Sequence, residues 1–278
     1  MSIRKKVFDG IVDAVIRLCR FDKANVVSCG ISEKIEPIFC VTHRNIKYFL
    51  SCPNNLTRWR AETYFTKEPE TIEWIDTFQR GDVLFDIGAN IGLYSIYAAK
   101  KNVKVIAFEP ESQNYALINK NVYLNNCEDQ VMVINIALSD TDCLDYLNIP
   151  SFQAGSAINC FKDTIDWNSE SFIPSFKQGI LSFSLDSFLL KYPVDFPTHI
   201  KIDVDGIEPK IIRGAQSTLS NKKLKSLSIE INEALPEHLE ILDNIKSHGF
   251  GLISKRHADM FEGGRYAKCF NYLFVRDK

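Results

Sequence analysis

The sequence predicts an α/β fold in which helices cover both faces of a mostly parallel sheet. After residue 80, short apolar runs of strand length alternate with segments whose apolar residues recur at helical spacing. That alternation is typical of parallel strands joined by right-handed crossovers. The chain then ends in two strand-like segments, near 250–254 and 269–275, which we expect to form a hairpin. A terminal hairpin beside parallel strands is compatible with a seven-stranded sheet.

The expected core elements follow one another in a regular order. We expect strands at 83–87, 103–108, 131–136, 199–204 and 226–231, and helices at 92–100, 112–125, 186–190, 208–219 and 236–247. Between Ser139 and Ser184 the rhythm breaks, and Asp, Ser, Asn, Pro and Gly become frequent. Such residues favour turns and loops. We therefore expect residues 139–184 to be an insertion, or lid, between the third and fourth core strands.

Residues 1–80 predict a small α+β preamble to a main domain at 81–278. The apolar residues Val7, Ile11, Val15 and Leu18 recur at helical spacing and predict an amphipathic helix. Two short strands at 38–41 and 47–50 and helices at 58–65 and 69–80 should follow. An exposed amphipathic helix of this kind is compatible with a homodimer.

The composition indicates a globular protein of ordinary type. The chain has 278 residues, of which 45% are hydrophobic and 24% charged, and a net charge of −2. This charge implies no general affinity for nucleic acid or for anionic membranes. We find no run of about 20 apolar residues that would span a membrane, and no signal-peptide pattern. The eight cysteines form no C-x-x-C pair, so we expect buried free thiols in a reducing cytoplasm and no zinc site.

The first core strand runs into a glycine-containing loop. Gly88 follows the strand at 83–87, and the next strand ends at Glu109, which lies 21 residues after Gly88. A strand, a glycine turn and an acid about 20 residues later describe a nucleoside-binding βαβ unit. The spacing therefore predicts a ligand with a ribose that Glu109 can bind.

The residues around the turn indicate which nucleoside is bound. A dinucleotide fingerprint would have glycine at positions 90 and 93, where this chain has Asn90 and Leu93. Asp86 ends the strand, and its carboxylate would repel a pyrophosphate but attract an ammonium or sulfonium group. S-adenosylmethionine (SAM) carries both groups. We therefore predict a SAM site and regard NAD as a distant alternative.

The fourth core strand ends in a row of charged residues. Lys201, Asp203 and Asp205 alternate onto one face, and Gly206 allows the chain to turn. Ligands of open α/β sheets lie at the carboxyl ends of the strands. Asp203 and Asp205 are therefore candidates for a general base or for holding the acceptor, with Lys201 offsetting their charge. In the alternative, Asp205 caps the helix at 208–219.

Two further groups complete the candidate catalytic set. Glu230 and Asn232 should emerge from the fifth strand near Asp203. An Asp, Glu and Asn grouping of oxygen ligands would suit magnesium, which is possible here but not favoured. His257, between the last two strands, is a second candidate base. We expect His199 to be structural and His238 and His248 to lie at the surface.

The third core strand should end beside the adenine. Ala137 and Leu138 are small and apolar and would form a flat slot. Asn135 and Asp140 are the polar candidates for the adenine edge. Gly155 and Ser156 of the insertion would lie over the pocket as part of a lid.

The motifs together resemble the FkbM-type methyltransferase family, over about residues 58–275. They are Lys67-Glu68-Pro69-Glu70-Thr71, Phe85-Asp86-Ile87-Gly88-Ala89-Asn90-Ile91-Gly92, Ala107-Phe108-Glu109-Pro110, Ala137-Leu138-Ser139-Asp140, Ser184-Leu185-Asp186 and Ile200-Lys201-Ile202-Asp203-Val204-Asp205-Gly206-Ile207-Glu208.

The resemblance implies a Rossmann-like class I sheet and methyl transfer from SAM to a hydroxyl. It extends the expected cofactor contacts to Phe85, Ala89, Asn90, Gly92 and Pro110. Acceptors in the family include sugars of surface glycans, and the preamble resembles the branch found with bacterial polysaccharide genes. We therefore expect a small-molecule or carrier-linked sugar as acceptor. The alternatives are another small metabolite, with or without a phosphate group, and a SAM-binding scaffold without catalysis.

Overall fold

The computed structural model describes residues 3–21, 26–35, 37–165, 167–168, 170–257, 262–264 and 266–277. The chain divides into two compact units, Met1–Ile38 and Phe39–Lys278, so the division falls well before the expected boundary at residue 80. The first unit contains the expected amphipathic helix as α1 (Ile3–Phe21), and a second helix that the sequence reasoning missed, α2 (Val26–Lys34).

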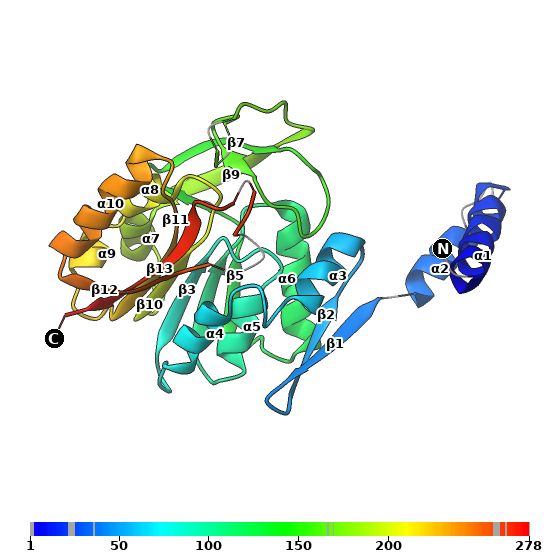
Figure 1. The fold of residues 1–278 in the computed structure, drawn as a ribbon, viewed down its shortest axis with the longest axis horizontal. Coiled ribbons are helices and arrows are strands. Elements are labelled where there is room, and N and C mark those ends of the chain that lie inside the picture. The colour runs from blue at the N-terminus through cyan, green and yellow to red at the C-terminus, as the bar shows by residue number, and fades with distance from the viewer. Residues whose placement is uncertain are drawn as a thin grey trace. The chain divides into compact units, whose positions relative to one another are not determined.

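The second unit is built on a seven-stranded sheet (Figure 1). The strands lie in the order β12-β13-β11-β10-β3-β4-β5. The five strands from β11 to β5 are parallel, and β13 runs antiparallel to β11 and β12. This arrangement confirms the predicted class I sheet with its terminal hairpin. The bounds are β3 (Val83–Ile87), β4 (Lys104–Phe108), β5 (Val131–Ile134), β10 (His199–Ile202), β11 (Ser226–Asn232), β12 (Phe250–Arg256) and β13 (Cys269–Arg276).

Helices cover both faces of this sheet, because alternate residues of each strand point to opposite sides. Phe85 and Ile87 pack in one buried cluster with α7–α10, whereas Leu84 packs in another with α4, α5 and α6. The helices are α4 (Pro69–Asp76), α5 (Leu93–Ala99), α6 (Ser112–Leu124), α7 (Leu185–Lys191), α8 (Glu208–Arg213), α9 (Gln216–Ser220) and α10 (Pro236–Ser247).

The expected helix at 208–219 is two helices that meet at Gly214. A Cβ on Gly214 would lie 2.3 Å from the carbonyl oxygen of Ser139, so only glycine allows this close packing. Asp186 then caps the start of α9 by accepting hydrogen bonds from the backbone N–H groups of Ser217 and Thr218. Tertiary packing therefore decides where the helical pattern breaks.

A hairpin and a short helix precede the sheet. The strands are β1 (Ile38–His43) and β2 (Ile46–Ser51), and α3 spans Asn55–Glu62. Asn121 and Asn125 of α6 hydrogen-bond the backbone of β2, which fixes the hairpin to the second unit. These bonds place α3 beside the insertion.

The insertion forms its own four-stranded sheet in the order β6-β9-β7-β8. Its strands are β6 (Ala137–Ser139), β7 (Cys143–Ile149), β8 (Cys160–Phe161) and β9 (Phe176–Ser184). The predicted interruption of the alternating strands and helices is therefore confirmed.

Several expectations for single residues need correction. His238 is buried, with 3% of its surface exposed, and not at the surface as expected. The eight cysteines are free, as expected, but Cys29 and Cys40 are exposed rather than buried. No helix in the described part of the chain is long and apolar enough to cross a membrane.

A buried polar cluster joins the amino ends of three strands. Asp82 accepts a hydrogen bond from Lys225 at 2.5 Å and lies 3.0 Å from Nε2 of His199. Nδ1 of His199 lies 2.7 Å from the hydroxyl of Ser226, which in turn accepts from the Trp74 indole at 2.8 Å. Burial would raise the pKa of Asp82, but these donors outweigh it and lower that pKa to about 2. His199 is therefore structural, as expected.

Replacing Asp82 by alanine should strip this cluster of its shared acceptor. We expect Asp82→Ala to lower the free energy of unfolding by about 2–4 kcal/mol, because buried donors lose their partner. The folded-state pKa lies below the ordinary value, so the stabilisation is present above about pH 4 and is lost as the pH falls towards 2. Urea denaturation at pH 7 and pH 3 measures both effects.

Asp195→Ala is the matched control. Asp195 pairs with Lys104 while its side chain is 59% exposed, and such pairs contribute about 0–1 kcal/mol. Equal losses for the two variants at pH 7 would contradict the structural role of Asp82.

Candidate functional site

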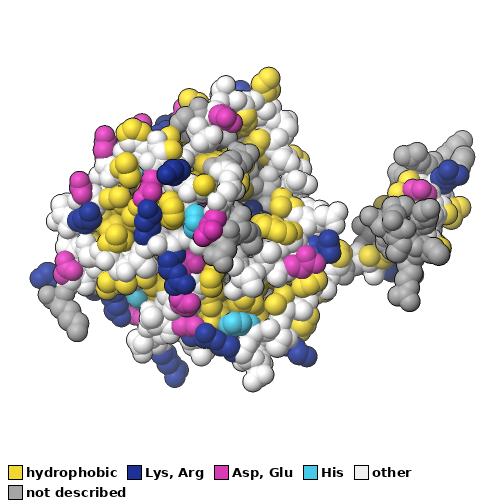
Figure 2. Space-filling view, viewed as in Figure 1, with side chains coloured by type: hydrophobic (Ala, Val, Ile, Leu, Met, Phe, Trp, Pro, Cys, Tyr) yellow, Lys and Arg dark blue, Asp and Glu magenta, His cyan; other side chains and the backbone are white. Residues whose placement is uncertain are grey.

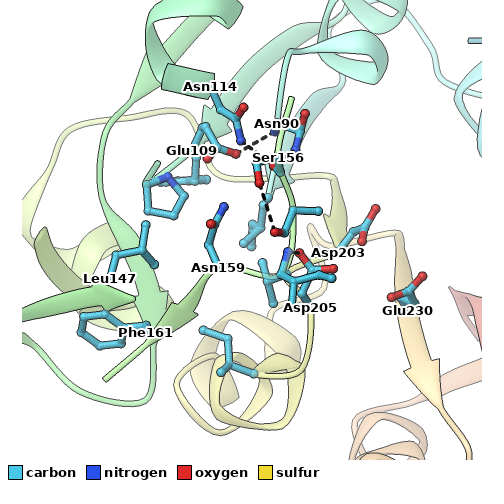
Figure 3. A pocket seen from close by; sticks show the side chains of 18 of the residues that line it. Asn90, Glu109, Asn114, Leu147, Ser156, Asn159, Phe161, Asp203, Asp205 and Glu230 are labelled. Carbon is cyan, nitrogen blue, oxygen red and sulfur yellow. Dashed lines mark hydrogen bonds between the residues drawn. The ribbon is translucent and has the colours of Figure 1, made fainter. Parts of the chain in front are cut away.

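A cavity of about 480 Å³ lies where the carboxyl ends of β3, β4, β10 and β11 meet the insertion. It is lined by residues that follow each of these strands, by the α3–α4 region and by the insertion (Figure 3). Ligands of open α/β sheets bind at this edge. The cavity has an apolar end, a central glycine loop and an acidic end.

The glycine loop is held against the fourth core strand. Gly88 has φ +82°, and a Cβ at this position would lie 1.9 Å from the carbonyl oxygen of Asp203. The backbone N–H of Asp203 donates to the carbonyl of Ile87 at 3.0 Å. Only glycine permits this approach, which brings the loop at 88–90 beside the acids that follow β10.

Glu109 lies in the centre of the cavity wall. One carboxylate oxygen accepts from the N–H of Asn90 at 2.7 Å, and the other from the N–H of Glu111 at 2.9 Å. Burial raises the pKa of Glu109 to about 7, although these two hydrogen bonds oppose the shift. A buried carboxylate held in place this way can accept hydrogen bonds from a ribose diol.

The apolar end lies beyond Glu109, and its walls come from two sheets. Ala137 and Leu138 line it, as expected, together with Pro110, Leu147 and Phe161. The polar residues expected here lie elsewhere. The amide of Asn135 donates to the carbonyls of Glu109 and Pro110, and the Asp140 carboxylate lies 3.5 Å from Arg213. Neither residue lines the cavity.

The insertion closes over the cavity through backbone hydrogen bonds. The Ser156 carbonyl accepts from the side-chain amides of Asn90 and Asn114, and Asn114 also accepts from the N–H of Gly155. Arg60 of α3 donates to the Gly155 carbonyl at 2.8 Å. Gly155 and Ser156, which the sequence predicts to be part of a lid, are thus tied to α3, to the glycine loop and to α6.

The acidic end contains Asp203, Asp205 and Glu230. Lys201 donates to Asp203 at 2.7 Å from beneath the cavity floor, where its side chain is only 3% exposed. Burial opposes the charge of Lys201, but Asp203, Glu68 and Asp86 outweigh it and raise its pKa. Lys201 therefore stays charged and orients Asp203.

Glu230 faces the cavity beyond Asp203 (Figure 3). Burial, and then the charges of Asp203, Glu208 and Asp205, raise the pKa of Glu230 well above its ordinary value. None of the hydrogen bonds of the described residues involves its carboxylate. The Glu230 carboxylate is thus a stronger base than an ordinary glutamate, and it is available to a ligand.

Asp205 holds the lid and does not cap a helix. Its carboxylate accepts from the backbone N–H of Ile158 at 2.7 Å, and burial followed by the charge of Asp203 raises its pKa. Glu208, at the start of α8, instead accepts from the N–H groups of Val204 and Gly206. The capping alternative for Asp205 is therefore wrong.

A second, smaller cavity adjoins the glycine loop. It is lined by Gly88, Ala89, Asn90, Asp203 and both members of the ion pair between Lys67 and Glu68, whose charged atoms lie 2.8 Å apart. Burial opposes the ionisation of Glu68, but Lys67 and Lys201 lower its pKa to about 2. A recess with both signs of charge suits the amino-acid end of SAM.

Other predicted residues lie outside both cavities or at their edges. Phe85 and Gly92 line neither, and Asp86 lies beneath the loop, where it accepts from the hydroxyl of Ser95 at 2.6 Å. The Asn232 amide donates to the Trp167 carbonyl at 2.9 Å instead of facing the cavity. His257 does line the cavity, and its ring lies 3.3 Å from the Cys269 carbonyl oxygen.

Among the described residues, no group of three or more His, Cys, Asp or Glu side chains is arranged to hold a metal ion. Sequence reasoning missed roles for Glu68, Asn114 and Asn159. Lys67 and Glu68, the two charged residues directly before Pro69, could have indicated a role for Glu68. Nothing in the local sequence marks Asn114 or Asn159, because the tertiary fold brings them to the cavity.

Comparison with known proteins places the chain in a family. Residues 86–252, more than half of the chain, match the profile of the methyltransferase FkbM domain. The chain belongs to the FkbM methyltransferase family. This match and the topology of the sheet agree with the resemblance drawn from the motifs.

Individual relatives are distant and cover the chain in part. The methyltransferase sdnD of Sordaria araneosa is 26% identical over an alignment of 153 positions that covers 47% of this chain and 59% of that protein. The tRNA (uracil(54)-C(5))-methyltransferase of Pyrococcus furiosus is 24% identical over 102 residues, 37% of this chain and 25% of that protein. The match thus spans between a quarter and three-fifths of these two relatives.

Among solved structures, the FkbM methyltransferase of Methylobacillus flagellatus KT superposes with a TM-score of 0.48 and 17% sequence identity. This match covers 79% of the present chain and 52% of that one.

The Glu109 carboxylate should contribute strongly to nucleoside binding. We expect Glu109→Gln to weaken binding of S-adenosylhomocysteine by roughly 10–100-fold, since hydrogen bonds to charged groups are worth about 1.5–3 kcal/mol. Calorimetric titration measures the affinity. Unchanged affinity in this variant would remove Glu109 from the binding site.

Binding should also depend on pH through this residue. With a pKa of about 7, Glu109 is increasingly protonated below neutral pH and then accepts fewer hydrogen bonds. The affinity for S-adenosylhomocysteine should therefore rise between pH 6 and pH 8 and level off above. In Glu109→Gln, the affinity should change less with pH across this range. The same slope in both proteins would show that another group causes the pH dependence.

Proposed function

We propose that the protein is a SAM-dependent O-methyltransferase of the cytoplasm that methylates a hydroxyl of a sugar or sugar-containing precursor in bacterial surface polysaccharide synthesis. The observation that carries the proposal is the order of groups along the cavity. An apolar slot leads to Glu109, then to the glycine loop, and then to Asp203 and Glu230.

The residues match SAM part by part. The apolar end suits a purine, Glu109 a ribose diol, and the recess at Lys67 and Glu68 an amino-acid end. When bound, SAM supplies an electrophilic methyl group. The chain itself must position the acceptor hydroxyl and remove its proton, because a sugar hydroxyl is a weak nucleophile.

Glu230 is best suited to take that proton. It faces the acidic end, its pKa is raised, and no hydrogen bond among the described residues occupies it. Asp203, oriented by Lys201, can accept a hydrogen bond from a neighbouring hydroxyl of the acceptor. Residues 156–159 of the insertion line the same cavity as these groups.

The charges of the cavity support an acceptor that is uncharged around the hydroxyl that reacts. Asp203, Asp205 and Glu230 lie together, so a phosphate that entered beside them would be repelled. On the face shown in Figure 2, Lys and Arg side chains are interspersed with Asp and Glu and form no continuous basic patch. These features favour a polyhydroxyl acceptor over the tRNA that some distant relatives are named for.

A panel of acceptors tests the proposal. Formation of S-adenosylhomocysteine would be measured with nucleotide sugars, free sugars and glycan oligosaccharides, against phosphorylated metabolites and tRNA. We expect turnover with a sugar hydroxyl, in the presence of EDTA as well as of magnesium. Turnover confined to phosphorylated metabolites or tRNA would overturn the assignment, as would binding of NADH in place of S-adenosylhomocysteine.

Glu230→Gln should separate catalysis from cofactor binding. With the acceptor found in the panel, we expect kcat to fall roughly 10²–10⁴-fold, the range for loss of a general base. Affinity for S-adenosylhomocysteine should change little. Glu233→Gln is the matched control, because Glu233 pairs with Lys255 and Tyr272 and does not line the cavity. Equal kcat values for the two variants would exclude Glu230 as the base.

A further inference from the structure

The carboxamide of Asn159 lies beside the apolar end of the cavity. Asn159 directly precedes β8, which ends at Phe161. Phe161 is paired with Leu147 across the insertion sheet, and all three line the cavity. Figure 3 shows Asn159 between Glu109 on one side and Leu147 and Phe161 on the other.

The carbonyl oxygen of the Asn159 side chain has no hydrogen-bond partner among the described residues. Its Oδ1 atom is buried and has no hydrogen bond within the described part of the chain. Buried polar groups in native proteins are nearly all satisfied, so each exception needs an explanation. Of the described residues that line this cavity, Asn159 alone has such an atom. A ligand that offers a donor at this point would supply the missing bond.

The backbone that presents Asn159 is strained. Ile158 has φ +65°, which is rare for a β-branched residue, and Asp205 has φ +61°. The two are joined by the hydrogen bond from the Ile158 N–H to the Asp205 carboxylate at 2.7 Å. Strain of this kind persists where the surrounding structure enforces it, and it concentrates at ligand clamps. Here it fixes the residue immediately before Asn159.

We propose that Asn159 recognises the purine edge of SAM. Its Oδ1 accepts from the exocyclic amino group of adenine, and its Nδ2 donates to the adjacent ring nitrogen. A carboxamide and an adenine edge each carry one donor and one acceptor side by side, so two hydrogen bonds form at once. The inference rests on the proposed function, because it assigns a residue to the cofactor of that reaction.

The lid thus becomes part of the cofactor site. Asn135 and Asp140, the polar candidates that follow β5, are turned away from the cavity. The insertion then recognises the adenine. Asp205 is a positioning residue, because its carboxylate holds the backbone N–H of Ile158 next to Asn159. Cofactor selectivity is therefore set by a segment outside the parallel sheet.

Calorimetric titration with two ligands tests the proposal. The ligands are S-adenosylhomocysteine and its analogue with unsubstituted purine in place of adenine, each titrated into wild type and Asn159→Ala. Wild type should bind the analogue roughly 5–30-fold more weakly, since a buried acceptor then loses its partner. Asn159→Ala should bind S-adenosylhomocysteine more weakly by a similar factor and should bind both ligands equally.

Gln153→Ala is the control, because Gln153 is exposed on the same insertion and does not line the cavity. Its two affinities should match those of wild type. Full discrimination retained by Asn159→Ala, or no discrimination by wild type, would overturn the role of Asn159 while leaving SAM binding in place. Failure of wild type to bind S-adenosylhomocysteine would instead overturn the proposed function. The two-ligand comparison on wild type needs no variant and stands even if Asn159→Ala does not fold.

Discussion

The close approach of Gly88 to the Asp203 carbonyl determines how the site is assembled. Two neighbouring parallel strands end together, and the absence of a side chain at Gly88 lets their following loops touch. One loop leads to Asn90, which donates its backbone N–H to Glu109, and the other leads to the acids of the opposite end. A single missing Cβ therefore joins the half of the cavity that suits a nucleoside to the half that suits an acceptor.

The electrostatics of the site follow from that proximity. Burial raises the pKa of Asp205 and of Glu230, and the charge of the neighbouring Asp203 raises both further. Lys201 beneath the floor and Lys67 in the cavity wall offset part of this negative charge. The raised pKa of Glu230 thus comes first from its burial and then from the charges of Asp203, Glu208 and Asp205, which all follow β10.

Sequence patterns predicted the sheet well, because alternation, glycine turns and strand-terminal acids are local signals. They placed Glu109, Gly88 and Asp203 in the cavity wall for the same reason. They failed where distant segments decide the outcome. Gly214 breaks a helical pattern because Ser139 packs against it, and the amide of Asn232 is drawn to the Trp167 carbonyl. Asn159 went unnoticed, because only the folded insertion brings it to the apolar end.

The two left-handed residues at the lid also bear on how fast ligands are exchanged. Residues 154–156 are anchored by Asn54, Arg60 and Asn114, whereas the Ile158 carbonyl accepts only from the Cys160 thiol and its N–H donates to Asp205, among the described residues. Breaking that bond allows both residues to relax, and each such conformation stores about 1–3 kcal/mol. The released strain offsets part of the cost of opening. Opening the lid beside Asn159 should therefore cost less free energy than opening it at residues 154–156.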